Sequence, residues 1–148
     1  MSIALITGSS GLVGSESAYF FSSKGFDIVG IDNNFRQVFF GKDASTIWQR
    51  NRLKNKIKNY KHFNADIRNY SNLEKIFKKF KKNISIIIHC AAQPSHDYGK
   101  NFPILDFDIN AKGTLNMLEL TKLYCPDAVF IHMSTNKVYG DNPNKLNI

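Results

Sequence analysis

Short apolar segments alternate with amphipathic segments along the 148 residues of this chain. The apolar segments predict five strands, which cover residues 2–6, 26–31, 60–65, 84–89 and 128–133. Most of these runs are continuously apolar, which is typical of a parallel sheet covered on both faces. Apolar residues at helical spacing predict helices between the strands, at residues 12–21, 72–82 and 103–124.

The alternation of strands and helices determines the expected fold. Each strand–helix–strand segment predicts a βαβ unit with a right-handed crossover. Five strands connected in this way form an α/β fold, which we expect to be a doubly wound parallel sheet with strand order 3-2-1-4-5. A chain of this length is one domain by the usual prior.

The segment between the second and third predicted strands is less regular. Gly41 interrupts residues 36–58, and residues 44–57 predict a helix that turns Trp48 and Leu53 inward. Helix boundaries elsewhere have clearer signals.

For helix 72–82, Ser71 and Glu74 predict a capping box. For the long helix, Pro103 fits the first turn and Pro126 ends the pattern.

Three glycines follow the first predicted strand, Gly8, Gly11 and Gly14, in a G-x-x-G-x-x-G pattern. This spacing is one residue wider than the usual dinucleotide fingerprint, and alone it can also mark an ordinary loop. Two features favour a dinucleotide site: the strand-to-helix context, and Asp32, eighteen residues after Gly14. In such a site Gly8 permits the turn, Gly11 admits the diphosphate, and Gly14 lets the helix pack closely. The diphosphate lies at the helix N-terminus.

The formal net charge of +8 raises the question of nucleic acid binding. However, many of the lysines fall between Lys54 and Lys82, where the apolar spacing of residues 73–80 predicts an amphipathic helix with a solvated lysine face. We therefore expect no nucleic acid partner.

The remaining composition is that of a globular protein, with 43% hydrophobic residues. The longest apolar runs, such as residues 84–90, are far shorter than the roughly 20 residues of a membrane span. The first residues lack the pattern of a secretory signal. Cys90 and Cys125 fit reduced core residues of a cytoplasmic protein. We expect no membrane association and no metal site.

Several motifs combine with the glycine turn: Asp66-Ile67 after the third strand, residues 89–92 after the fourth, residues 110–116 in the long helix, and Ser-Thr-x-x-Val-Tyr-Gly at 134–140. With these motifs the chain resembles the extended short-chain dehydrogenase/reductase superfamily over its whole length. The resemblance implies a Rossmann-like domain and NAD as the cofactor.

Three further segments, at residues 91–97, 106–110 and 134–141, are similar to the CDP-paratose 2-epimerases of that superfamily. Residues 39–45 also resemble an insertion that those enzymes carry after the second strand. This resemblance implies that the substrate is a nucleotide sugar, CDP-paratose, whose sugar carbon 2 is inverted through a transient keto intermediate. Another nucleotide-sugar epimerase, a 4,6-dehydratase and a non-catalytic NAD-binding module remain as alternatives.

The resemblance also assigns cofactor-binding residues, which lie in the glycine turn and at the strand ends: Gly8, Ser10, Gly11, Leu12, Val13, Gly14, Asp32, Asn33, Asn34, Arg36, Asp66, Ile67, Ala91, Ala92, Gln93 and Asn110. Asp32 would accept hydrogen bonds from the adenosine ribose and repel a 2′-phosphate, which favours NAD over NADP. Asp66 and Ile67 would contact the adenine. Each aspartate can alternatively be an ordinary turn residue.

Thr135 matches the family's catalytic hydroxyl, by its position relative to Val-Tyr-Gly. Ser95, His96 and Asp97 are adjacent in sequence, so they cannot present three side chains in a hydrolase relay. In the resembled family this loop faces the substrate, which gives Ser95 and His96 a possible substrate-binding role.

One departure from the family is large, because these enzymes use a Tyr-x-x-x-Lys pair and no tyrosine here has a lysine four positions later. We therefore expect residues 1–148 to be an incomplete NAD-binding domain, without the substrate-binding part of a longer enzyme. In the resembled family the long helix forms half of a dimer interface, which implies a homo-oligomer. Its apolar residues here are Phe107, Leu115, Leu118 and Leu120.

Overall fold

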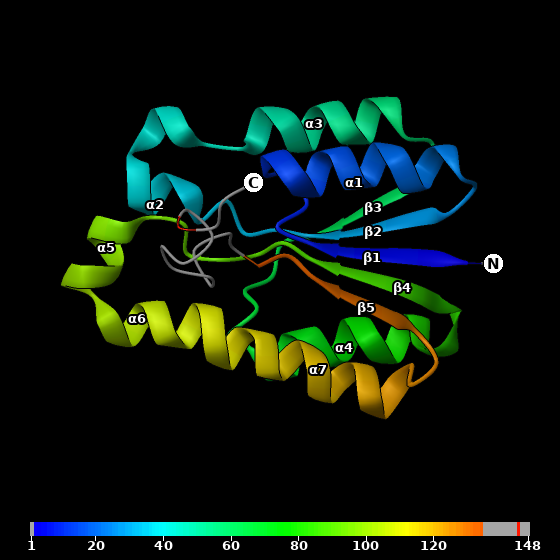
Figure 1. Ribbon diagram of the computed structural model, residues 1–148. Coiled ribbons are helices and arrows are strands. Elements are labelled where there is room, and N and C mark those ends of the chain that lie inside the picture. Colours follow the sequence, from blue (N-terminus) through cyan, green and yellow to red (C-terminus); the bar gives the residue numbers. More distant parts are fainter. Residues whose placement is uncertain (1, 135–144, 146–148) are drawn as a thin grey trace.

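The computed structural model describes residues 2–134 and 145. Its centre is a five-stranded parallel sheet in the order β3-β2-β1-β4-β5, which confirms the predicted topology (Figure 1). The strands are β1 (Ile3–Thr7), β2 (Asp27–Ile31), β3 (Tyr60–Phe63), β4 (Ile84–His89) and β5 (Val129–His132). β1 lies in the middle, with Leu5 opposite Val29 on one side and Ile87 on the other.

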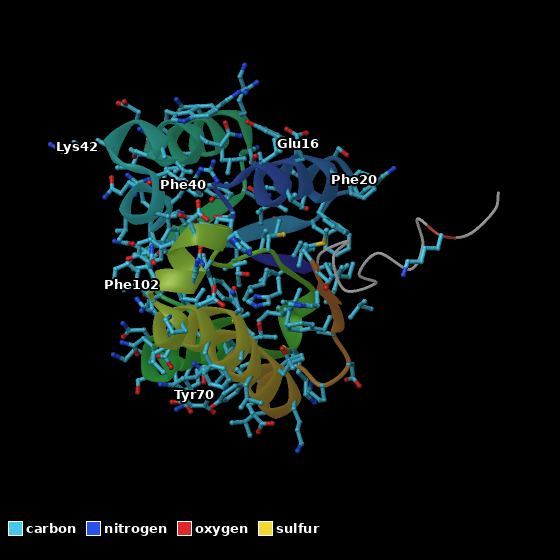
Figure 2. All side chains as sticks on the ribbon, turned by 60° about the vertical axis from the view of Figure 1, so that its left-hand side comes forward. Glu16, Phe20, Phe40, Lys42, Tyr70 and Phe102 are labelled. Atoms are coloured by element: carbon cyan, nitrogen blue, oxygen red, sulfur yellow. The ribbon has the colours of Figure 1, made fainter. Side chains whose placement is uncertain are left out.

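Helices cover both faces of this sheet. On one face lie α1 (Leu12–Ser23) and α3 (Ile47–Lys56), and on the other α4 (Tyr70–Phe80) and α7 (Gly113–Tyr124) (Figure 1). Figure 2 shows Glu16 and Phe20 on α1, and Tyr70 at the start of α4 on the opposite side. None of the helices in the described part of the chain combines the length and apolar character that a bilayer span needs.

The shorter helical elements complete the chain. Those toward the carboxyl ends of the strands are α2 (Arg36–Phe40), α5 (His96–Asn101) and α6 (Pro103–Phe107) (Figure 1). Single turns are the 3₁₀ helices η1 (Lys42–Ala44) and η2 (Lys81–Asn83) and the π-helix η3 (Asp108–Lys112).

Alternate residues of the central strand feed two separate cores. Ile3 and Leu5 pack in the core beneath α4 and α7, whereas Ala4 and Ile6 pack in the core beneath α1 and α3. Because both faces are covered, both sets of side chains are buried, and all five residues of β1 are buried. This explains why the strand is a continuous apolar run.

The predicted long helix is interrupted by one π-turn. η3 lies between α6 and α7, so the helical path from Pro103 to Tyr124 contains a single turn with wider hydrogen bonding. Immediately after it, Gly113 lies against Ile67, whose Cδ1 would be 2.6 Å from a Cβ at this glycine. The glycine therefore allows α7 to approach the loop that follows β3.

Two local predictions on the helices were wrong. α4 is capped by Asn69, whose side chain accepts a hydrogen bond from the Asn72 N–H, so Ser71 lies inside the first turn. In α3, Leu53 is buried as predicted, but Trp48 is 64% exposed. The inward face is formed by Gln49 and Leu53, which are one helical turn apart, and Trp48 falls outside it.

The lysine-rich helix has the predicted amphipathic character. Its buried residues are Leu73, Ile76, Phe77 and Phe80. Lys78 and Lys79 lie on the exposed face, and Lys78 pairs with Glu74 one turn earlier. Packing of the apolar face on the sheet therefore accounts for the residue pattern of this segment.

The apolar residues of the long helix divide into two groups. Leu120 is fully buried, which corrects its expected place on an outer surface, whereas Phe107, Leu115 and Leu118 are 64%, 56% and 44% exposed.

A truncation of Leu120 to alanine should leave a cavity and lower the free energy of unfolding by about 2–5 kcal/mol. The matched Leu118→Ala change should alter it by only about 0.5 kcal/mol. Urea unfolding followed by circular dichroism measures both, and equal losses would contradict the assigned packing of α7.

Candidate functional site

A cleft of about 250 Å³ lies at the carboxyl ends of the strands. In doubly wound sheets ligands bind at this edge, where the strand order reverses, here between β1 and β4. Many of the predicted cofactor residues line it: Gly8, Gly11, Leu12, Val13, Gly14, Asp32, Asn33, Arg36, Asp66, Ile67, Ala91 and Ala92. Residues far apart in the sequence therefore meet in one cleft.

The three glycines of the turn have different structural reasons. Gly8 has a φ of +63°, and a Cβ there would lie 2.9 Å from the Ala91 backbone nitrogen. A Cβ on Gly14 would lie 2.2 Å from the Gly8 carbonyl oxygen, so this glycine lets α1 pack onto the turn. Gly11 has an ordinary extended backbone, with φ −76° and ψ 175°, and it borders the cleft. A Cβ at Gly11 would lie 3.2 Å from the Gly8 carbonyl oxygen, so the missing side chain relieves the turn and also leaves this part of the cleft open.

The N-terminus of α1 faces this cleft through Leu12 and Val13. Within the described residues, no side chain caps the helix, and its first turn contains no acidic residue. The first N–H groups of a helix lack intrahelical partners and carry partial positive charge. This end of α1 therefore suits the negatively charged diphosphate of a dinucleotide.

Asp32 follows β2 and fixes the turn. Its Oδ2 accepts a hydrogen bond from the Ser10 N–H at 3.0 Å, and its Oδ1 accepts one from the Asn34 N–H at 2.8 Å. The carboxylate also lines the cleft. Because a carboxylate has about four acceptor positions, Asp32 can accept further hydrogen bonds from a ligand.

Asp66 belongs to a charged cluster that was not predicted from the sequence. Arg68 donates to its carboxylate through Nε at 2.9 Å and through a terminal nitrogen at 2.6 Å, and Asn33 donates at 3.1 Å. Burial raises the pKa of Asp66, but the hydrogen bonds from Arg68 outweigh this effect and hold the pKa below its usual range. The carboxylate is therefore a fixed anion in the wall of the cleft.

Four predicted cofactor residues form the surroundings of the cleft and are not among its lining residues: Ser10, Asn34, Gln93 and Asn110. Ser10 is buried beneath the turn, and Asn34 holds the segment before α3 through Thr46. Asn110 accepts a hydrogen bond from the Gln93 N–H at 2.9 Å. Direct contact of these residues with a cofactor stays a prediction.

Several lining residues were missed by the sequence analysis as candidates for the site: Phe35, Phe39, Thr46, Cys90 and Pro94. Phe39 and Thr46 belong to the irregular segment after β2, for which no element before residue 44 was predicted. Cys90 directly precedes the two predicted alanines. Burial raises the pKa of its thiol to about 11, so the thiol is protonated at neutral pH.

Ser95 and His96 occupy the start of α5, a helix that was not predicted. The Ser95 Oγ accepts a hydrogen bond from the Tyr98 N–H at 3.2 Å and so caps the helix. His96 lies 3.6 Å from Asp97, and both side chains are almost fully exposed. The described residues thus give no relay among these three, in agreement with the sequence analysis. Thr135 lies outside the described residues.

A buried histidine connects the two central strands with the long helix. Thr7 Oγ1 accepts hydrogen bonds from the Cys90 and Ala91 N–H groups, so its proton is free to be donated to His89 Nδ1 at 2.7 Å. Thr114 donates its own proton to the Asn110 carbonyl, and its oxygen lies 3.0 Å from His89 Nε2. His89 therefore carries its proton on Nε2.

This arrangement favours the neutral ring. Burial, together with the smaller electrostatic effect of the stacked His132, lowers the pKa of His89 to about 4. His89 thus acts as a neutral link between the end of β1 and the start of α7.

These features define a Rossmann-like protein: a parallel sheet, a cleft where the strand order reverses, a glycine turn after β1 and an acidic residue after β2. Residues 5–147 match the family described as GDP-mannose 4,6 dehydratase, and the chain belongs to that family.

Two curated relatives support this membership. The chain is 34% identical to a CDP-paratose 2-epimerase of Salmonella typhi over 93% of this chain and 38% of the relative. It is 32% identical to a UDP-glucuronate 4-epimerase of Thermodesulfobacterium geofontis over 97% of this chain and 42% of the relative. The chain therefore spans about two fifths of the length of these relatives.

Solved structures agree with the fold. A UDP-glucose 4-epimerase from Bifidobacterium longum, in complex with NAD+ and UDP, superposes with a TM-score of 0.79 at 24% identity, covering 94% of this chain and 38% of the other. A dTDP-glucose 4,6-dehydratase from Bacillus anthracis, in complex with NAD, gives 0.71 at 25% identity, covering 95% and 39%.

The low pKa of His89 predicts a pH-dependent stability. The unfolded chain binds a proton at His89 near pH 6.5, but the folded chain does so only near pH 4, so stability falls as the pH drops through this window. Between pH 7 and pH 5 the wild type should lose about 2 kcal/mol more than His89→Gln, which cannot take up this proton. Urea unfolding at both pH values measures the difference.

An independent check does not depend on the variant. Long-range ¹H–¹⁵N NMR spectra of the wild type should show the Nε2–H tautomer of His89 and no protonation of the ring above pH 5. A ring that titrates near pH 6.5 would contradict the buried network.

Proposed function

We propose that this chain forms the NAD-binding part of an NAD-dependent nucleotide-sugar epimerase. The observation that carries the proposal is the cleft itself, in which the bare backbone at Gly11, the N-terminus of α1 and the carboxylate of Asp32 converge. Membership of a family whose relatives are named as epimerases and dehydratases supports the activity. The NAD complexes of two similar structures support the cofactor.

The residues of the cleft fit different parts of the cofactor. The N–H groups of α1 and the glycine turn would hold the diphosphate, Asp32 the adenosine ribose, and Asp66 with Ile67 the adenine. Ala91 and Ala92 follow β4 and line the cleft, and their methyl side chains would leave room for a cofactor that passes over the sheet. When bound, NAD supplies a reversible hydride acceptor for the oxidation of a sugar carbon.

We further propose CDP-paratose as the substrate of the whole protein and CDP-tyvelose as its product. The Salmonella relative, 34% identical, and the segment at residues 91–97 support this choice over UDP-sugars. Ser95 and His96 would face the substrate at the open end of the cleft, and Thr135 would hydrogen-bond the reacting sugar hydroxyl. A cytoplasmic location fits a reaction on nucleotide sugars.

A homo-oligomer is also proposed. The outer surface of α6 and α7 carries large exposed apolar side chains, Ile104, Phe107, Leu115, Leu118 and Leu123. Large exposed apolar surface commonly marks a protein–protein contact. In the resembled family this helix contacts a second copy of the chain, so a second copy is the proposed partner.

Asp32 gives a test of cofactor choice. A 2′-phosphate would place its negative charge beside this carboxylate, so the wild type should bind NAD(H) more tightly than NADP(H). The Asp32→Asn change should weaken NADH binding and reduce the preference about tenfold, since one charge interaction of about 1.4 kcal/mol is lost. Asp43→Asn, at an exposed acidic residue of η1, is the matched control. Fluorescence titration measures all affinities, and an equal or stronger affinity for NADPH would overturn the role of Asp32.

Gly11 gives a test of the diphosphate site. The backbone conformation of Gly11 is one that valine readily adopts, and a Cβ there would lie 3.2 Å from the Gly8 carbonyl oxygen, so Gly11→Val should fold after a small shift of the turn. The valine side chain would occupy the space of the diphosphate. We expect NADH binding to fall below detection. Ser23→Val, at the exposed last residue of α1, adds similar bulk away from the cleft. Calorimetric titration, with circular dichroism to verify folding, decides the matter; unchanged affinity of Gly11→Val would mean that the glycine serves only the turn.

A further inference from the structure

The segment after β2 is held as one side of the cleft by Asn34. This residue has a φ of +58°, and its Oδ1 accepts hydrogen bonds from the Thr46 N–H at 2.7 Å and from the Ser45 hydroxyl at 3.2 Å. These hydrogen bonds join the two ends of a loop formed by residues 35–44, and α2 lies on this loop. Phe35 and Phe39 from this loop line the cleft.

Facing this loop is α5, which is anchored by another amide. Gln93 is 7% exposed, and its Nε2 donates to the Ser95 carbonyl at 2.8 Å and to Asp106 Oδ1 at 2.7 Å. A Cβ on Gly99 would lie 3.1 Å from both Gln93 Nε2 and Asp106 Oδ1, so α5 sits closely over this network. The segment that leads into α5 is thus fixed by Gln93, as the ends of the α2 loop are fixed by Asn34.

The two sides meet through aromatic rings. Phe39 on α2 and Tyr98 on α5 lie with ring centroids 4.9 Å apart at an interplanar angle of 70°. Phe35 contacts Phe39 at 5.1 Å, and Phe102 contacts Tyr98 at 4.6 Å. The two pairs that include Phe39 are edge-to-face and the Tyr98–Phe102 pair is tilted, and aromatic pairs at such distances are attractive. A row of four rings therefore joins the segment after β2 to the segment after β4, beside the cleft.

Neither short helix has a core of its own. No residue of α2 and no residue of α5 is buried, both elements lying within the described residues. Elements with few buried apolar contacts open at low free energy, while their neighbours stay folded. Phe39 is partly buried and packs against the core beneath α4 and α7, whereas α5 has no buried residue. The contact between Phe39 and Tyr98 can therefore open by movement of α5 while Phe39 stays on the core.

We propose that Phe39 and Tyr98 form an aromatic strap that retains the dinucleotide in the cleft. The strap separates when the cofactor binds or leaves, and its closed form slows dissociation. This inference rests on the proposed function, because it requires NAD in the cleft. It assigns a cofactor-retaining role to two side chains, one of which, Tyr98, does not line the cleft.

The experiment measures release of NADH. The chain is loaded with NADH and mixed in a stopped-flow instrument with excess NAD+, and the fluorescence change gives the dissociation rate. Phe39→Ala and Tyr98→Ala should each release NADH roughly threefold to tenfold faster, the factor that one aromatic pair contributes. The double variant should be no faster than either single variant, because the rings act as a unit.

Two controls distinguish the strap from general damage. Tyr98→Phe keeps the ring and should keep the wild-type rate. Val38→Ala removes an exposed apolar side chain from the same helix as Phe39 and should also keep it. Phe39→Leu, which retains apolar volume, provides a gentler second variant if Phe39→Ala is unfolded by circular dichroism.

The outcomes separate the two proposals. Wild-type dissociation rates in Phe39→Ala, Phe39→Leu and Tyr98→Ala, with NADH still bound, would overturn the strap and leave the proposed function intact. Additive effects in the double variant would also overturn it. A wild-type chain that binds no NADH would overturn the proposed function itself.

Discussion

The close approach of backbone to backbone at the end of β1 is the constraint on which the rest depends. Gly14 brings the first turn of α1 against the Gly8 carbonyl, and Gly8 in turn lies against the backbone at Ala91. The turn after β1, the first helix and the end of β4 are thereby held together without intervening side chains. Thr7 and His89 complete this junction by a buried hydrogen bond. The position of the cleft between the glycine turn and the end of β4 follows from this junction.

Farther from this junction, side-chain amides hold the loops in place by hydrogen bonds to the backbone. Asn34, Gln93, Asn110 and Asn116 each hold a backbone segment near the cleft, and Asn116 donates to the carbonyls of residues 67 and 68. An amide can donate and accept together, which allows one side chain to satisfy a turn and to fix its direction. The loops at the carboxyl ends of the strands are therefore positioned by specific polar contacts as well as by apolar packing, such as that of Phe35 and Phe39 on the core.

Most of the fold could be predicted from the sequence because its signals are local. Continuous apolar runs mark the strands, and the glycine turn with Asp32 marks one side of the cleft. The missing parts depend on contacts across long sequence separations, such as Phe39 with Tyr98. Competition between close alternatives was also decisive: Asn69 caps α4 although Ser71 and Glu74 offered a plausible capping box. Arg68 was missed because only the turn after β3 directs its guanidinium back to Asp66.

The π-turn η3 has a consequence for how the long helix can change length. Each residue of an α-helix turns the chain by about 100°, so one residue more or less rotates everything beyond it. η3 contains such an extra residue between α6, which follows the loop of the cleft, and α7, which packs Met117 and Leu120 into the core. A deletion here would therefore act as a change of phase more than as a shortening. It would rotate the buried face of α7 by about 100° relative to α6, and so move Met117 and Leu120 away from their places in the core.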